Sequence, residues 1–168
     1  MDQEEMLQRA WHGSSIIFFY ETTRDYLRFL LNTVIDESSA PALIEKLMDL
    51  YRQGSKLPRD EDIYRCDDMP VLEPAMHWAG TNSIRFRYSP LYWGCFNPFH
   101  DENGNHQLCL SADLGDIGDE MMKGIREYEN GNSFDALGIW RDGWRLHWGQ
   151  HAVSAIRVLH WMITEHSF

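Results

Sequence analysis

The feature that most constrains this chain is its last third, residues 133–166, which contains no proline. When successive residues are placed about 100° apart, the large apolar and aromatic side chains from Trp140 to Met162 fall on one half of the circumference. This pattern predicts one uninterrupted amphipathic helix, roughly 50 Å long at a rise of about 1.5 Å per residue. A break near Gly143 or Gly149 would contradict that prediction.

The inner face of this predicted helix combines aromatic with charged side chains. The expected inner cluster consists of Trp140, Arg141, Trp144, Arg145 and Trp148. A buried charge is tolerated only when it is paired. The sequence therefore predicts a polar-aromatic cluster on this face, without assigning it a function.

Three further segments carry apolar side chains at helical spacing, namely residues 2–35, 41–52 and 111–129. With the last third, they predict a mainly α fold with a bundle-like core of about four helices, two long and two short. A chain of 168 residues is long enough for one complete core. We therefore expect residues 1–168 to form a single helical domain.

Residues 57–110 differ from the rest, because they hold five of the six prolines of the chain and many aromatic residues. Apolar residues alternate with arginines over 84–88, which predicts a strand. Residues 92–96 and 106–110 are expected to pair across Asn103 and Gly104, a favoured hairpin turn. We predict an irregular segment with a small β-hairpin that covers the helices as a lid.

Three segments together resemble a known family. They are YWGCFNP at 92–98, SADLGDI at 111–117 and the tryptophan- and histidine-rich stretch at 140–160. The chain from about Tyr92 onward resembles an uncharacterised bacterial helical family catalogued as domain of unknown function 5063. That resemblance implies an α-helical fold and no particular activity. Where the family has paired aspartates at the start of a helix, this chain has Ala112 before Asp113.

The sharpest candidate for chemistry is His147 with His151, four residues apart on the predicted helix, a spacing that can hold a transition metal. Asp113 and Asp116 of the neighbouring helix would supply carboxylates if the two helices pack antiparallel. Such a site would bind a divalent metal and suit a metal-dependent hydrolase. The metal site is the second of two interpretations of these residues, because Arg141 and Arg145 near the same face would compete for the carboxylates.

The first expectation for the same residues is structural. On this interpretation, a buried hydrogen-bonded network pairs the two histidines and two arginines with two aspartates and the tryptophan indoles. Its charged members are His147, His151, Arg141, Arg145, Asp113 and Asp116. Histidine pairs at this spacing are common on helices, and a metal site requires converging geometry as well. No resident cofactor is then expected.

The charge balance bears on partners and location. The chain has 15 Lys and Arg against 26 Asp and Glu, a net charge of −11. Such a surface repels phosphate backbones, so we expect no nucleic-acid partner, and a protein partner would present a basic surface. The acidic N-terminal residues do not resemble a signal peptide, and the longest uncharged stretch near them, residues 10–20, is too short to span a membrane. Three scattered cysteines favour a reducing compartment, so we expect a cytoplasmic protein.

From the sequence alone, the leading functional hypothesis is a non-enzymatic protein-binding module of the immunity or adaptor kind. It depends on the acidic charge, the lack of a recognisable catalytic motif and the aromatic residues of the lid segment. Metal binding through His147 and His151 is the second hypothesis. A third is a small-molecule pocket lined by Trp78, Trp93 and Trp144.

Overall fold

The computed structural model of the chain describes residues 3–58, 85, 91–94 and 106–164, with side chains from residue 14 onward. These residues form a mainly α structure with one small antiparallel sheet, as the sequence predicts. The helices are α1 (Gln3–Asn32), α2 (Ala40–Gly54), α3 (Leu110–Glu129), α4 (Ser133–Leu146) and α5 (Trp148–Thr164), and the strands are β1 (Leu91–Gly94) and β2 (His106–Cys109).

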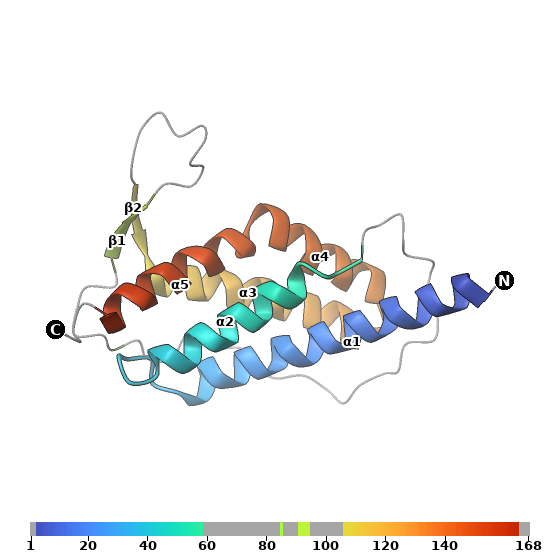
Figure 1. Cartoon of the computed structure of the whole chain (residues 1–168), viewed down its shortest axis with the longest axis horizontal. Helices are drawn as coiled ribbons and strands as arrows, with labels where there is room; N and C mark the ends of the chain where they lie inside the picture. The colour runs from blue at the N-terminus through green and yellow to red at the C-terminus, as the bar shows by residue number, and fades with distance from the viewer. Residues whose placement is uncertain (1–2, 59–84, 86–90, 95–105, 165–168) are drawn as a thin grey trace.

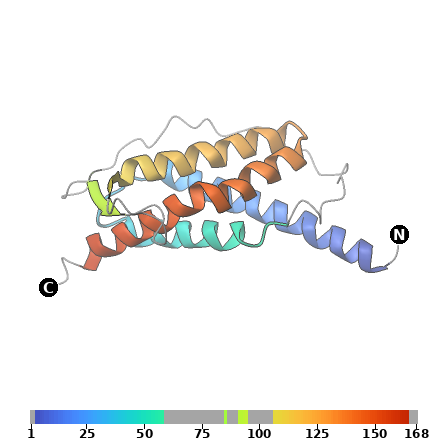
Figure 2. The ribbon, with the colours of Figure 1, turned by 90° about the horizontal axis from the view of Figure 1, so that it is seen from above.

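The long helices lie side by side as an elongated bundle (Figures 1 and 2). α1 packs on α2, α2 packs on α5, and α3 packs on both α4 and α5. The core between them is apolar and rich in aromatic rings. The ring of Phe19 in α1 lies 5.2 Å from that of Trp140 and 6.0 Å from that of Trp148, measured between centroids. Both indoles are completely buried, so Trp140 and Trp148 face the core as the sequence predicts.

The prediction of one uninterrupted C-terminal helix is wrong. α4 ends at Leu146 and α5 begins at Trp148, and His147 between them has non-helical φ and ψ of −143° and −89°. Its backbone N–H still donates to the carbonyl of Gly143, while its own carbonyl accepts from Gln150, the start of the next helix. The joint is thus a single residue, and the two helices meet there at an angle (Figure 1).

Close packing around Trp148 explains the break. The Trp148 indole is buried and donates from Nε1 to the carbonyl of Trp140, 2.8 Å away. The backbone of Gly149 lies so close to α4 that a Cβ there would stand 2.0 Å from the carbonyl oxygen of Trp144. Only glycine permits this approach of two backbones.

The break also corrects the predicted inner cluster. Trp140, Trp148 and Arg141 are buried and Trp144 is half-buried, but Arg145 is exposed. Five positions along a helix turn Arg145 by about 140° from Trp140, away from the core. Arg145 is therefore exposed, one residue before α4 ends.

The predicted hairpin is confirmed in its described strands. β1 pairs antiparallel with β2, and Leu91 opposes Cys109 while Gly94 opposes His106. The predicted turn at Asn103 and Gly104, the predicted strand at 84–88 and Trp78 lie outside the described residues, as does most of the predicted lid segment. Within the described part of the chain, none of the helices has the length and apolar character that a membrane crossing requires.

Candidate metal centre

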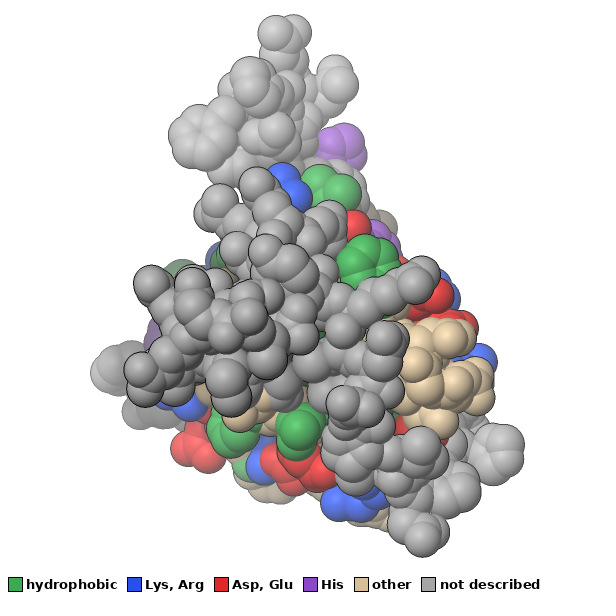
Figure 3. Space-filling model, turned by 90° about the vertical axis from the view of Figure 1, so that its right-hand side faces the viewer, with side chains coloured by type: hydrophobic (Ala, Val, Ile, Leu, Met, Phe, Trp, Pro, Cys, Tyr) green, Lys and Arg blue, Asp and Glu red, His purple; other side chains and the backbone are tan. Residues whose placement is uncertain are grey.

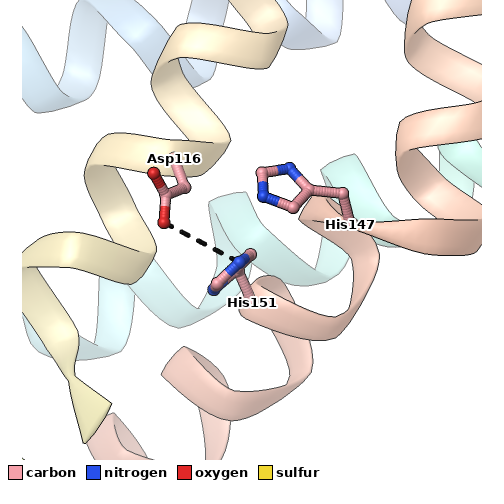
Figure 4. Close-up of side chains that lie close together, drawn as sticks. All are labelled: Asp116, His147 and His151. Atoms are coloured by element: carbon pink, nitrogen blue, oxygen red, sulfur yellow. Dashed lines mark ion pairs between the residues drawn. The ribbon is translucent and has the colours of Figure 1, made fainter. Parts of the chain in front are cut away.

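Asp116, His147 and His151 converge at the joint between α4 and α5 (Figure 4). Asp116 projects from α3, His147 is the joint itself, and His151 lies one turn into α5. One ligand atom from each side chain lies within 4.8 Å of the other two. Two imidazole nitrogens and a carboxylate oxygen form a donor set that transition metals accept.

The measured spacing is close to what an ion needs. Ligand atoms held at about 2.1 Å from one tetrahedral ion stand about 3.4 Å apart. Nε2 of His151 and Oδ2 of Asp116 are 3.7 Å apart, close to that value. The widest separation in the group, within 4.8 Å, exceeds the tetrahedral value by at most about 1.4 Å. Rotation of an exposed side chain such as His147 covers such a difference.

Asp113 orients His151. Its Oδ1 lies 2.7 Å from Nδ1 of His151, and the carboxylate side chain is only 5% exposed. Because a carboxylate accepts, Nδ1–H is the donor and the lone pair of a neutral imidazole is left on Nε2. That nitrogen is the one that approaches Asp116. A carboxylate, a histidine and an open ligand position in this order are typical of metal centres.

Tyr92 supports Asp113 from the hairpin. Its hydroxyl donates to Oδ2 of Asp113, the oxygen that His151 does not use. Burial, aided by this hydrogen bond, raises the pKa of Tyr92, so the phenol remains a donor at neutral pH. Sequence reasoning missed this role of Tyr92, although the YWGCFNP segment that contains it is one of the family motifs.

Glu120, one turn further along α3, reaches the other side of the centre. Its Oε1 lies 3.6 Å from Nδ1 of His147, and 3.7 Å from Nζ of Lys123. Glu120 is therefore placed to hold the imidazole of His147 or to serve as a further oxygen ligand. A Cβ on Gly143 would meet Oε2 of Glu120 at 2.5 Å, so glycine at the end of α4 leaves room for this carboxylate.

The centre is buried on one side and open on the other. Asp113 is almost inaccessible, whereas the side chain of His147 is 48% exposed. The hydrogen bond to Asp113 outweighs burial and raises the pKa of His151 above its ordinary 6.5. The charged pair therefore stabilises the fold fully below about pH 6.5, and that contribution is lost as pH rises through the raised pKa.

The four predicted metal residues thus lie together, in two roles. Asp116, His147 and His151 present ligand atoms to one another, while Asp113 contacts His151 from behind. The expected buried network of arginines and indoles has a different form. Arg141 pairs with its neighbour Asp142 at 2.9 Å, and Arg145 is exposed. The indoles of Trp140 and Trp148 donate to backbone carbonyls.

The predicted small-molecule pocket has a different composition from the one expected. Trp144 packs against Tyr51, with ring centroids 5.5 Å apart, on the α2 side of the bundle. Trp93 instead lines a groove with residues of β1 and α5. The two tryptophans therefore belong to separate regions, and Trp78 lies outside the described residues.

Comparison with known proteins gives one family. No curated protein matches the chain, and no solved structure matches it. Residues 88–165 match the family described as Domain of unknown function (DUF5063). The matched segment contains β1, β2, α3, α4 and α5, and with them all the residues of the candidate metal centre. The match covers the same part of the chain as the three motifs that resemble this family, and it gives no activity.

Proposed function

We propose that this protein binds a divalent transition metal through Asp116, His147 and His151. The observation that supports the proposal is the convergence of their three ligand atoms within 4.8 Å, with His151 oriented by the buried Asp113. Two imidazoles and one carboxylate suit zinc, iron and nickel better than magnesium or calcium, which prefer oxygen ligands.

The open side of the centre bears on what a bound ion would do. Three protein ligands would leave at least one coordination position for water, and solvent can reach the centre because His147 is 48% exposed. A bound ion lowers the pKa of such a water and makes it a nucleophile at neutral pH. Metal-assisted hydrolysis is therefore the reaction class that this centre would suit.

The test uses untagged protein, since a histidine tag would itself bind metal. Protein stripped with a chelator is titrated with zinc, nickel or ferrous ions by calorimetry, and purified protein is analysed for elements. We expect one ion per chain and saturable binding of zinc. The proposal would be contradicted if the purified protein contained much less than one metal ion per chain and the titration detected no zinc binding at micromolar concentration.

Asp113→Asn is expected to lower zinc affinity about 10- to 100-fold, the usual effect of losing the carboxylate behind a histidine ligand. The uncharged amide of Asn accepts a weaker hydrogen bond from Nδ1–H of His151 than the carboxylate does. The imidazole is then less basic at Nε2 and a weaker metal ligand. Tyr92→Phe is expected to cause a smaller loss, because it removes a hydrogen bond that supports Asp113 and leaves the carboxylate itself in place. Calorimetric zinc affinities of the two variants, compared with wild type, check this order.

Equal affinities in all three proteins would show that Asp113 has no part in holding the ligand. Stability measured in chelator is the control, because Asp113 is buried and its loss also affects the fold.

Protein binding remains the second candidate function, and one surface favours it. A hollow of about 270 Å³ between α1 and α2 is lined by the exposed Phe18 and by Glu21, Asp25 and Asp49. Lys46 already pairs with Asp25 there, and Arg52 pairs with Asp49. Acidic and basic side chains are likewise interspersed among the described residues seen on the end face in Figure 3.

The hollow combines one exposed apolar side chain with three acidic and two basic ones, so a protein partner would contact Phe18 and complement these charges. Affinity capture with Phe18→Asp and Phe134→Asp tests the idea, since Phe134 is equally exposed on α4. A partner bound at the hollow is lost only with the first variant.

That the chain forms a single domain, and that it is bacterial and cytoplasmic, stay predictions from the sequence.

A further inference from the structure

A second candidate site lies where the hairpin meets the C-terminal half of α5 (Figure 1). A groove of about 400 Å³ opens there, within the size range of small-molecule sites. It is lined by Tyr92, Trp93, Arg157, Val158, Trp161 and Met162. None of these residues is a proposed metal ligand, and only Tyr92 touches the metal centre, through Asp113.

The groove has aromatic walls that face solvent. Trp93 is 66% exposed and Trp161 is 57% exposed, although tryptophan is normally among the more buried residues of a protein. Trp93 belongs to β1 and Trp161 to α5, and the flat indole rings of both line the groove, where a planar ligand could contact them. Aromatic rings stack on such surfaces at little cost in conformational entropy.

Arg157 places a positive charge in this groove. Its Nη2 donates to the backbone carbonyl of Trp93 at 3.3 Å. Among the described residues no carboxylate pairs with this guanidinium, in a chain where acidic residues far outnumber basic ones. A guanidinium has further N–H donors in a planar fork that fits a carboxylate.

Gly94 makes room for this arginine. A Cβ at position 94 would lie 2.7 Å from Nη2 of Arg157 and 2.9 Å from the side chain of Leu108. The guanidinium therefore lies directly over the strand backbone, in a position that a larger residue at 94 would block. Strand and helix together fix the charge beside the two tryptophan rings.

We infer that this groove binds a small aromatic carboxylate, with its ring between Trp93 and Trp161 and its carboxylate on Arg157. The rings supply the apolar contact, and the arginine selects anions in a molecule whose net charge of −11 otherwise repels them. The site is independent of the metal proposed above, because its residues contact a ligand without an ion.

The test uses 2-naphthoate as the probe and 2-naphthamide as its uncharged analogue of the same shape. Both are titrated into chelator-treated full-length protein, so that failure of the metal proposal does not affect the result. We expect saturable one-to-one binding of naphthoate and weaker binding of naphthamide. Arg157→Gln is expected to reduce naphthoate affinity about tenfold and to leave naphthamide affinity unchanged.

Two further variants separate the ring contacts from the charge. Trp161→Ala is expected to weaken both probes, and Gly94→Ala is expected to act like Arg157→Gln by displacing the guanidinium. Phe134→Ala, which removes an equally exposed ring on α4, is expected to change neither affinity. Absence of naphthoate binding at millimolar concentration would overturn the inference, and so would equal affinity for both probes that Arg157→Gln leaves unaltered.

Discussion

Gly124→Ala is expected to lower the free energy of unfolding by about 2 kcal/mol or more, because it forces a methyl group into the ring of Trp140. A Cβ at position 124 would lie 2.0 Å from Nε1 and 2.3 Å from Cε2 of that indole. The ring has little freedom to move. It is fully buried, its Nε1 donates to the carbonyl of Met121, and Phe19 packs against it.

Gly115→Ala in the same helix is the matched control. A Cβ at position 115 would meet nothing within 4 Å, so the change adds only the better helix propensity of alanine. We expect Gly115→Ala to raise the free energy of unfolding by up to about 1 kcal/mol. Urea denaturation of both variants measures the contrast. Similar values for the two would mean that α3 and α4 are not packed through Gly124 and Trp140.

His147→Ala is expected to lower zinc affinity by at least about 100-fold, because loss of a ligand costs more than loss of a supporting group. His147 is half exposed, so its removal leaves the core intact and the effect is readable in folded protein. His160→Ala is the control, since His160 is an exposed histidine of α5 that lies outside the three-residue metal group. Calorimetric titration of chelator-treated samples gives both affinities.

Asp116→Asn is expected to lose zinc to a similar degree, because the amide is a much poorer ligand than the carboxylate. The metal assignment would be wrong if His147→Ala bound zinc as tightly as wild type does. It would also be wrong if His160→Ala lost as much affinity as His147→Ala, since that would indicate general surface binding.

Periodicity predicted most of the architecture. The apolar side chains of α2 and α3 repeat at helical spacing, and their burial follows that spacing. The joint at His147 escaped prediction because the amphipathic pattern continues through it: Trp140 before the joint and Trp148 after it both face the core. Gly149 was the visible signal, but a helix tolerates single glycines, and only the nearby Trp144 carbonyl shows why this one is needed.

The sequence singled out the residues of the candidate centre, but it did not predict how they are arranged. A spacing of four residues brings His147 and His151 together on a regular helix, yet here His147 is outside both helices, with its ring 4.8 Å from that of His151. The separate role of Asp113 depends on its burial and on the direction of one imidazole. Neither follows from spacing, because both result from packing between α3 and α5.

The single-residue joint has a mechanical consequence. On a continuous helix, the position of His147 relative to His151 would be fixed by the helix itself. Here His147 lies between α4 and α5, so its position depends on the angle between these two helices. An ion bound by Asp116 of α3, His151 of α5 and His147 at the joint would hold these three parts together and so fix that angle. Metal binding would thus restrict the angle between α4 and α5, and a change in that angle would separate the metal ligands.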